Sequence, residues 1–151
     1  MQSVPLIPDL IYGTLIVAAP LLIFMRHAKS DWADAKLTDH DRPLNARGRQ
    51  AAPRMAQQLA MQGWVPTCVL SSTATRTRET LQRMLPTWNC DESSLQIHWV
   101  EELYLATPAT IRKTIVEHWN PGTTLILGHN PGMEILCSEL SDQIEGMPTA
   151  A

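Results

Sequence analysis

The sequence predicts one α/β domain of three layers, in which a mostly parallel sheet is covered on both sides by helices. Short apolar runs of strand length alternate along the chain with longer segments whose apolar residues recur at helical spacing. The 151 residues suffice for one domain with its own core and are too few for two comfortable ones. Ligands of such sheets collect at the carboxyl ends of the strands, so the site is expected there.

The first predicted strand lies in the apolar run that begins at Leu21 and ends at Met25. Five consecutive apolar residues bounded by polar ones indicate a strand buried on both faces. Arg26 and His27 follow it directly. The segment 31–42 is rich in Asp, Lys and Thr and has no periodicity, which predicts a surface loop.

A helix is expected to begin after Asn45, which is a plausible N-cap. Its apolar stripe consists of Ala52, Met55, Ala56 and Leu59. Gly63 suits a left-handed stop, and Pro53 removes one backbone donor inside the helix and should bend it.

The second strand is predicted over 68–70, and a turn rich in Ser and Thr connects it to Arg76. The next helix carries an apolar face and is expected to end at Pro86, before a polar loop over 87–94. The face of this helix is made by Thr77, Leu81, Met84 and Leu85.

The third strand is predicted over 97–100 and is followed by Glu101 and Glu102. The next helix begins at Thr107-Pro108, a cap followed by proline at the first helical position. Its buried stripe is expected to be Ile111, Ile115 and Trp119.

The fourth strand, over 124–127, is followed at once by Gly128, His129 and a Pro131-Gly132 turn. The final helix then places Met133, Leu136, Cys137 and Leu140 on one face.

Composition excludes several classes of protein. The net charge of −3 gives no reason to expect a nucleic-acid surface, so any anion site must rely on local positive charge. The three cysteines are widely spaced and form no CxxC pair. Disulfide scaffolding and a structural zinc site are therefore not expected, and a reducing, cytoplasmic setting is predicted.

The chain divides into an apolar N-terminal extension, 1–20, and a domain, 21–151. The apolar run from Leu10 to Met25 is short for a membrane span, and Asp9 stands where a signal peptide carries Lys or Arg. The extension could be an extra packed segment, a membrane-associated leader, or the result of a start assigned too far upstream. We favour a non-essential extension and expect no membrane association. The residues 147–151 resemble the approach to another element, so the domain is expected to be truncated at its C-terminus.

Each predicted strand delivers polar side chains to the same edge of the sheet, and these predict a phosphate site. Two arginines, two histidines and a carboxylate converge there, beside two helix N-termini that attract anions. The arginines and histidines are Arg26, His27, Arg76 and His129, and the carboxylate comes from the adjacent pair Glu101 and Glu102. Neither GxxxxGK[ST] nor GxGxxG occurs, so nucleotide binding through such loops is not supported. A metal site on His27, His129 and Asp39 is the rival interpretation, which two arginines among the ligands disfavour.

The motifs, taken together, resemble the histidine phosphatase superfamily, and within it the SixA-like phosphohistidine phosphatases. The similarity covers 21–150 and includes Met25-Arg26-His27-Ala28-Lys29-Ser30, Asp39 to Asn45 with Arg47-Gly48, Leu70-Ser71-Ser72 with Arg76 and Thr80, Glu102-Leu103-Tyr104, and Gly128 to Gly132. It implies the phosphoglycerate mutase-like fold. Departures are the leader, the absence of a closing strand after 148–150, and Thr73 where proline is usual.

The resemblance also implies roles for the residues. His27 would attack phosphorus and become a phosphohistidine, which water then hydrolyses. Arg26 and Arg76 would bind the phosphoryl oxygens, and His129 would donate to the same oxygens, best as an imidazolium. Glu102 is the candidate that protonates the leaving group, although Glu101 is adjacent. No metal and no cofactor is expected.

The predicted function is that of a metal-independent phosphatase in signal transduction, acting on a phosphohistidine of a protein such as a histidine phosphotransfer domain. The connection over 85–96 is too short to form a lid, and an uncovered pocket gathers little binding energy from a small molecule. The alternatives are a phosphatase or mutase for a small phosphoester metabolite, and a phosphate-binding module without activity.

Overall fold

A computed structural model describes residues 19–141 and 147–150, and within them it confirms the predicted parallel α/β sheet. Four strands form one sheet in the order β1-β4-β2-β3, with every neighbouring pair parallel. The strands are β1 (Leu21–Arg26), β2 (Cys68–Ser72), β3 (Gln96–Val100) and β4 (Thr123–Gly128). Of the predicted extension, 1–20, only Ala19 and Pro20 lie within the described residues.

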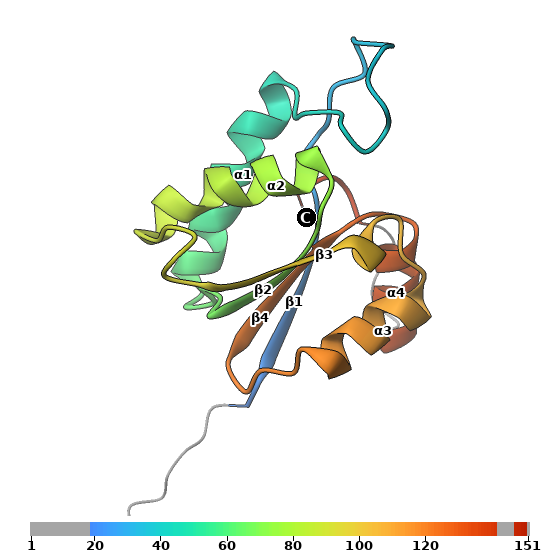
Figure 1. The fold of residues 1–151 in the computed structure, drawn as a ribbon. Coiled ribbons are helices and arrows are strands. Elements are labelled where there is room, and N and C mark those ends of the chain that lie inside the picture. The colour runs from blue at the N-terminus through green and yellow to red at the C-terminus, as the bar shows by residue number, and fades with distance from the viewer. Residues whose placement is uncertain (1–18, 142–146, 151) are drawn as a thin grey trace, which may run out of the picture.

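Helices cover both faces of the sheet, as Figure 1 shows, so the domain has the three predicted layers. Helices α1 (Ala46–Met61) and α2 (Thr75–Met84) lie on one face, and α3 (Pro108–Glu117) and α4 (Gly132–Leu140) lie on the other. Two short 3₁₀ helices, η1 (Leu85–Trp88) and η2 (Glu101–Leu103), follow α2 and β3. None of the helices in this described part of the chain is both long and apolar enough to cross a membrane.

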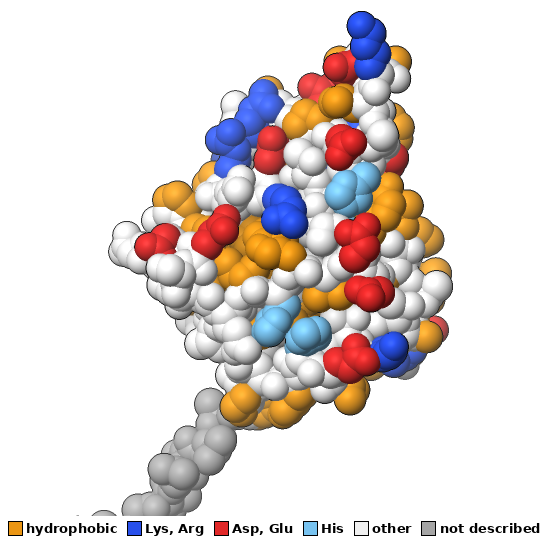
Figure 2. All heavy atoms as spheres, viewed as in Figure 1, with side chains coloured by type: hydrophobic (Ala, Val, Ile, Leu, Met, Phe, Trp, Pro, Cys, Tyr) orange, Lys and Arg blue, Asp and Glu red, His pale blue; other side chains and the backbone are white. Residues whose placement is uncertain are grey.

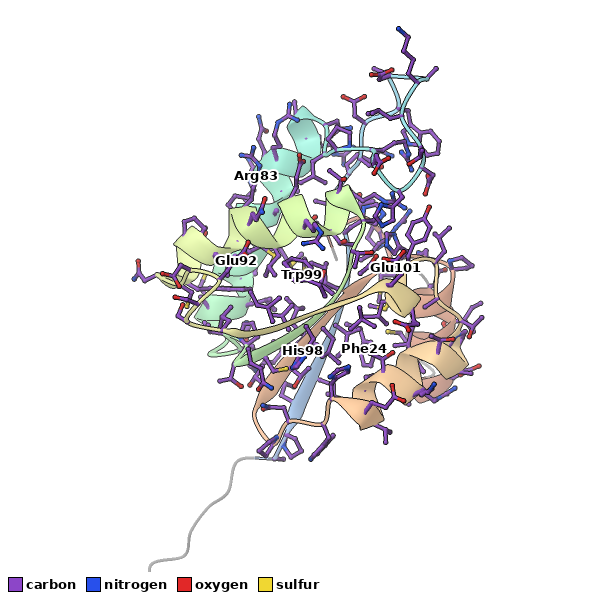
Figure 3. The ribbon with its side chains drawn as sticks, viewed as in Figure 1. Phe24, Arg83, Glu92, His98, Trp99 and Glu101 are labelled. Atoms are coloured by element: carbon purple, nitrogen blue, oxygen red, sulfur yellow. The ribbon has the colours of Figure 1, made fainter. Side chains whose placement is uncertain are left out.

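Two apolar clusters hold the layers together because strand side chains alternate between the faces of the sheet. Val69 and Leu125 pack in the cluster under α1 and α2, whereas Leu70 and Ile126 pack in the cluster under α3 and α4. All four are fully buried, and each contributes roughly 1.5–3 kcal/mol of transfer free energy. The alternation is visible in Figure 3, where Phe24 and Trp99 lie on opposite sides of the sheet.

Local signals in the sequence position the helix ends as predicted. The Asn45 side chain accepts a hydrogen bond from the Gly48 N–H at 2.9 Å and caps α1. Thr107 caps α3 in the same way, and Gly63 takes the left-handed backbone conformation, with φ of 72°. Pro53 lies inside α1 as expected.

Three local predictions need correction. Trp119 does not belong to the buried stripe of α3: the helix ends at Glu117, and the Trp119 side chain is 58% exposed. The backbone of His118 already leaves the helical conformation, so the 3.6-residue periodicity no longer applies at Trp119. Strand β2 continues to Ser72 because its last two residues pair with the end of β3. The segment predicted to be a loop from residue 87 begins with the end of η1.

Candidate active site

The site lies at the carboxyl ends of the neighbouring strands β1 and β4. His27 follows β1 and His129 follows β4, and the His27 N–H donates to the Gly128 carbonyl at 3.1 Å, which holds the two strand ends together. Arg76 is the second residue of α2. The three side chains are almost completely buried, with exposed fractions of 6% for His27 and 2% each for Arg76 and His129. The predicted convergence of these residues is therefore present in the fold.

These residues line one pocket of about 280 Å³ whose charge favours anions. Its lining includes four cationic side chains, Arg26, Lys29, Arg42 and Arg76. Asp39 is the one carboxyl group among the lining residues that the structure describes. The rings of His27 and His129 are neighbours in this pocket, with centroids 5.1 Å apart and planes tilted by 54°. Helices α2 and α4 begin at the same edge of the sheet, so their N-terminal dipoles add to the positive potential.

Arg76 connects the elements of the site. Its Nε donates to His27 Nε2 at 3.2 Å, and one terminal nitrogen contacts His129 Nδ1 at 3.2 Å. The terminal nitrogens also donate to the Asp39 carbonyl at 2.5 Å and to the Asp39 carboxylate at 3.0 Å. The planar fork of a guanidinium can hold several partners at once, which an ammonium cannot do in this geometry. Arg76 thus positions both histidines.

The hydrogen bonds of His27 show which of its ring nitrogens carries the proton. Its Nδ1 lies 2.7 Å from the carbonyl oxygen of Ala28, which only accepts, so Nδ1 carries the proton. Its Nε2 accepts from Arg76 and therefore presents a lone pair. Burial is the main cause that lowers the pKa of His27 to about 4. The hydrogen bond to Ala28 raises this pKa, whereas the positive charges of Arg76, Arg26 and Arg42 lower it further. His27 is therefore neutral at neutral pH.

His129 is neutral as well. Because Arg76 can only donate, Nδ1 of His129 accepts, and its Nε2 donates to Ser72 Oγ at 2.8 Å. Burial, followed by the charges of Arg76 and His27, lowers the pKa of His129 to about 3. An imidazolium, as the resemblance implied for this residue, would require the added negative charge of a phosphoryl group in the pocket.

The depressed histidine pKa values predict a loss of stability in acid. Between pH 6.5 and about 4 the unfolded chain binds protons on His27 and His129 that the folded protein does not, so the free energy of unfolding falls with falling pH. The loss should reach about 2 kcal/mol for each histidine by pH 5. Urea denaturation at pH 7 and pH 5 measures it. His129→Asn should make the slope shallower; an unchanged slope would contradict neutral burial of His129.

Asp39 is held as a carboxylate by three neighbours. Arg42 donates to one carboxylate oxygen at 2.6 Å and 3.1 Å, while Tyr104 and Arg76 donate to the other at 2.6 Å and 3.0 Å. Although partial burial opposes it, the hydrogen bonds from Tyr104 and Arg42 and the charge of Arg76 hold the pKa of Asp39 well below its usual range. Asp39 orients two arginines and carries no proton to donate.

Arg26 lies at the side of the pocket formed by the last described residues of the chain. One of its terminal nitrogens donates to the Met147 carbonyl at 3.3 Å, and the Ala150 N–H donates to the carbonyls of Arg26 and His27 at 3.1 and 3.2 Å. The buried Nε of Arg26 has no hydrogen-bond partner among the described residues. A buried unpaired donor is costly, and a phosphoryl oxygen in the pocket would satisfy it.

The two glutamates after β3 are placed differently from the other predicted residues. Glu102 is exposed on η2 and is not among the residues that line the pocket. Glu101, labelled in Figure 3, is exposed as well and accepts from the Thr73 hydroxyl at 2.5 Å. The structure therefore brings together the predicted arginines and histidines but does not bring Glu102 to them, and its role as the acid stays a prediction.

The geometry also bears on the rival metal site. The Arg76 guanidinium contacts His27, His129 and Asp39, so a cation occupies the position that a shared metal ion would need. In the described ranges no group of three His, Cys, Asp or Glu side chains could hold a metal ion.

Sequence reasoning gave no catalytic function to several residues of the site. Arg42, Tyr104 and Ser72 belong to motifs that carried the resemblance, but their sequence positions did not indicate their partners. Asp39 was considered only as a metal ligand. The spacing of Asp39 and Arg42 by three residues was the one local signal, since side chains at this spacing lie together in a helical turn.

The parallel α/β fold and this pocket define a class of protein in which cationic side chains surround two neutral histidines at the edge of a sheet. The chain belongs to the histidine phosphatase superfamily (branch 1), whose family model matches residues 22–103. The solved structure of a protein assigned as phosphohistidine phosphatase SixA, from Agrobacterium tumefaciens, is 30% identical with a TM-score of 0.76, and the match covers 85% of each chain.

An uncharacterized chloroplastic protein of Arabidopsis thaliana is 38% identical over 128 residues, which is 80% of this chain. The match spans 58% of the length of the Arabidopsis protein. A mycobacterial glucosyl-3-phosphoglycerate phosphatase shares the fold at 16% identity, with a TM-score of 0.60 and coverage of 86% of this chain and 88% of its own.

Proposed function

We propose that this protein is a metal-independent phosphatase that removes the phosphoryl group from a phosphohistidine of another protein through a covalent intermediate on His27. The observation that carries the proposal is the state of Asp39, the one described carboxyl group that lines the pocket. Because Asp39 accepts hydrogen bonds from Arg42, Arg76 and Tyr104, the pocket offers a nucleophile and cations but no protonated acid.

The chemistry proceeds in two steps. Nε2 of His27 attacks phosphorus in line, its N–P bond forms, and the bond between phosphorus and the substrate nitrogen breaks. A water molecule then attacks the phosphohistidine, inorganic phosphate leaves, and the electron pair returns to Nε2 of His27. Arg26, Arg42 and Arg76 match the charge on the phosphoryl oxygens in both steps. His129 and Lys29 add to the same field when a dianion is bound.

The leaving group decides between substrate classes. An alkyl phosphate releases an alkoxide, which needs a proton from an acid in the transition state. The imidazole of a phosphohistidine can instead take up a proton from solvent on its distal nitrogen before the N–P bond breaks. A pocket without a protonated acid therefore favours a phosphoramidate over an alkyl ester. If Glu102 does supply a proton, it must do so from outside the residues that line the pocket.

The test compares kcat/KM for three substrates in the presence of EDTA: a phosphorylated histidine phosphotransfer domain, p-nitrophenyl phosphate, and an alkyl phosphate such as phosphoserine. We expect the phosphotransfer domain to exceed phosphoserine by at least tenfold, which corresponds to about 1.4 kcal/mol. The aryl ester, whose leaving group is stable as an anion, should be turned over without an acid. A preference for the alkyl phosphate, or a requirement for added metal, would overturn the proposal.

A further inference from the structure

The pocket has a cationic floor and an apolar rim. Among its described lining residues, Trp32 and Leu105 are the large apolar ones, and their side chains are 72% and 52% exposed. They belong to different loops, one after β1 and one after η2. His27 and Arg76, in contrast, are buried at the base of the same pocket. A group attached to a bound phosphoryl group must leave the pocket past the rim.

Trp32 is held in place although it is exposed. The guanidinium of Arg42 lies 3.4 Å from the centroid of the indole ring. Arg42 is itself fixed, because it donates to the Asp39 carboxylate and, at 3.0 Å, to the Ser30 hydroxyl. One face of the indole is thus covered by a rigid cation, and much of the ring remains open to solvent. Such a surface is preorganised to contact a second flat group.

Leu105 is held in a backbone conformation that leucine rarely adopts, with φ of 49°. The segment around it is tightly packed. Leu103 and Ala106 are buried on either side of it, and the Ala106 carbonyl packs so closely against Gly132 that a Cβ at Gly132 would collide with it. Glycine would take this conformation without strain, yet the position carries an exposed apolar side chain at the pocket rim. Strain of this kind concentrates at functional sites.

We propose that Trp32 and Leu105 form an apolar collar that receives the imidazole ring of the phosphohistidine while the phosphoryl group lies on the cationic floor. This inference rests on the proposed function and makes the collar its determinant of specificity. A flat ring one bond from phosphorus would contact the open indole surface and the leucine methyl groups. A phosphosugar would instead press hydroxyl groups against the same apolar atoms, which costs free energy when the hydroxyls find no partner.

The variants separate this role from folding. Trp32→Ala removes one side of the collar and Trp32→Phe restores a ring. Leu105→Gly removes the other side while it relieves the backbone, so the thermal midpoint should stay equal or rise although selectivity falls. Trp119→Ala is the matched control because Trp119 is also an exposed tryptophan and lies outside the pocket lining. A residue with only a structural role would lower stability and selectivity together.

The measured quantity is the ratio of kcat/KM for the phosphorylated phosphotransfer domain to kcat/KM for phosphoramidate, which carries no ring. We expect Trp32→Ala and Leu105→Gly each to lower this ratio at least tenfold, Trp32→Phe to recover most of it, and Trp119→Ala to leave it as in the parent. Ratios that stay within twofold of the parent in both collar variants would overturn the inference.

A phosphate ester that carries a ring allows the collar to be tested even if the proposed function is wrong. If the parent enzyme prefers an alkyl phosphate, the proposed function fails, and the ratio for p-nitrophenyl phosphate against phosphoramidate then tests the collar alone. A drop of that ratio in the collar variants supports ring recognition, and an unchanged ratio rejects it.

Discussion

Replacing His27 with alanine should abolish turnover and the covalent phosphoenzyme. Nε2 is the deprotonated nitrogen of the His27 ring, because the Ala28 carbonyl holds the proton on Nδ1. Without it, the phosphoryl group can still bind to the arginines but has no nucleophile to accept it. In the parent, brief incubation with a phosphorylated substrate followed by denaturation should leave acid-labile, alkali-stable phosphate on His27. The measurement combines steady-state turnover with mapping of the labelled peptide.

The control for this experiment is His98→Ala. His98 lies in β3 away from the pocket and pairs with His118 at a ring distance of 4.4 Å, so both rate and label should survive its loss. His27→Ala should keep its fold because His27 belongs to neither apolar cluster. Undiminished turnover in folded His27→Ala, or label on another residue, would refute the mechanism.

Replacing Arg76 with alanine should lower kcat by 10²–10³-fold, which corresponds to about 3–4 kcal/mol of transition-state stabilisation. The change removes a charged donor to the phosphoryl oxygens and releases both histidines from a common partner. It also leaves Arg42 and Tyr104 as the donors to Asp39. Arg76→Lys should recover only a small part of the rate, because one ammonium cannot replace the planar fork. Steady-state assays with the phosphorylated phosphotransfer domain as substrate, quenched at fixed times, measure these rates.

Arg83→Ala is the matched control, since Arg83 is an exposed arginine of the same helix and lies outside the pocket. Its rate should equal that of the parent. A loss in Arg83→Ala as large as in Arg76→Ala would mean that the helix charge, and not the placement of Arg76, drives the reaction. A phosphate-binding assay on Arg76→Ala separates weaker binding from slower chemistry.

The distribution of charge on the surface indicates that the positive charge of the pocket is local. Acidic and basic side chains are interspersed on the face of the molecule shown in Figure 2, without a broad basic area. The four cations of the pocket lining are therefore a local concentration in a chain of net charge −3. Attraction of a phosphoryl group arises inside the pocket and along the helix N-termini more than from the protein as a whole.

The strands and the two histidines were predictable because their signals are local. A run such as Leu21 to Met25 cannot be fully exposed without a large loss of hydrophobic free energy, so its place in a sheet follows from composition. The predicted burial on both faces was wrong for most of this strand: β1 lies at an edge of the described sheet, and of the run only Met25 is fully buried. The polar residue directly after each such run must then lie at the carboxyl edge. Trp119 shows where this reasoning ends: helical periodicity predicts burial only while the helix continues, and the helix ends two residues earlier.

The sequence by itself determined the α/β layers, the order of strand ends along the chain, and the identity of His27, Arg26, Arg76 and His129 as neighbours at one edge. Tertiary structure alone decided which nitrogen of His27 is free, that Asp39 is an ionised acceptor, and that Glu102 lies outside the pocket lining. The physical reason is the separation along the sequence of the residues that determine each feature. Burial and strand pairing depend on apolar patterns within short windows, whereas protonation and donor geometry depend on side chains that approach within 3 Å from segments distant in sequence, such as Asp39 and Tyr104.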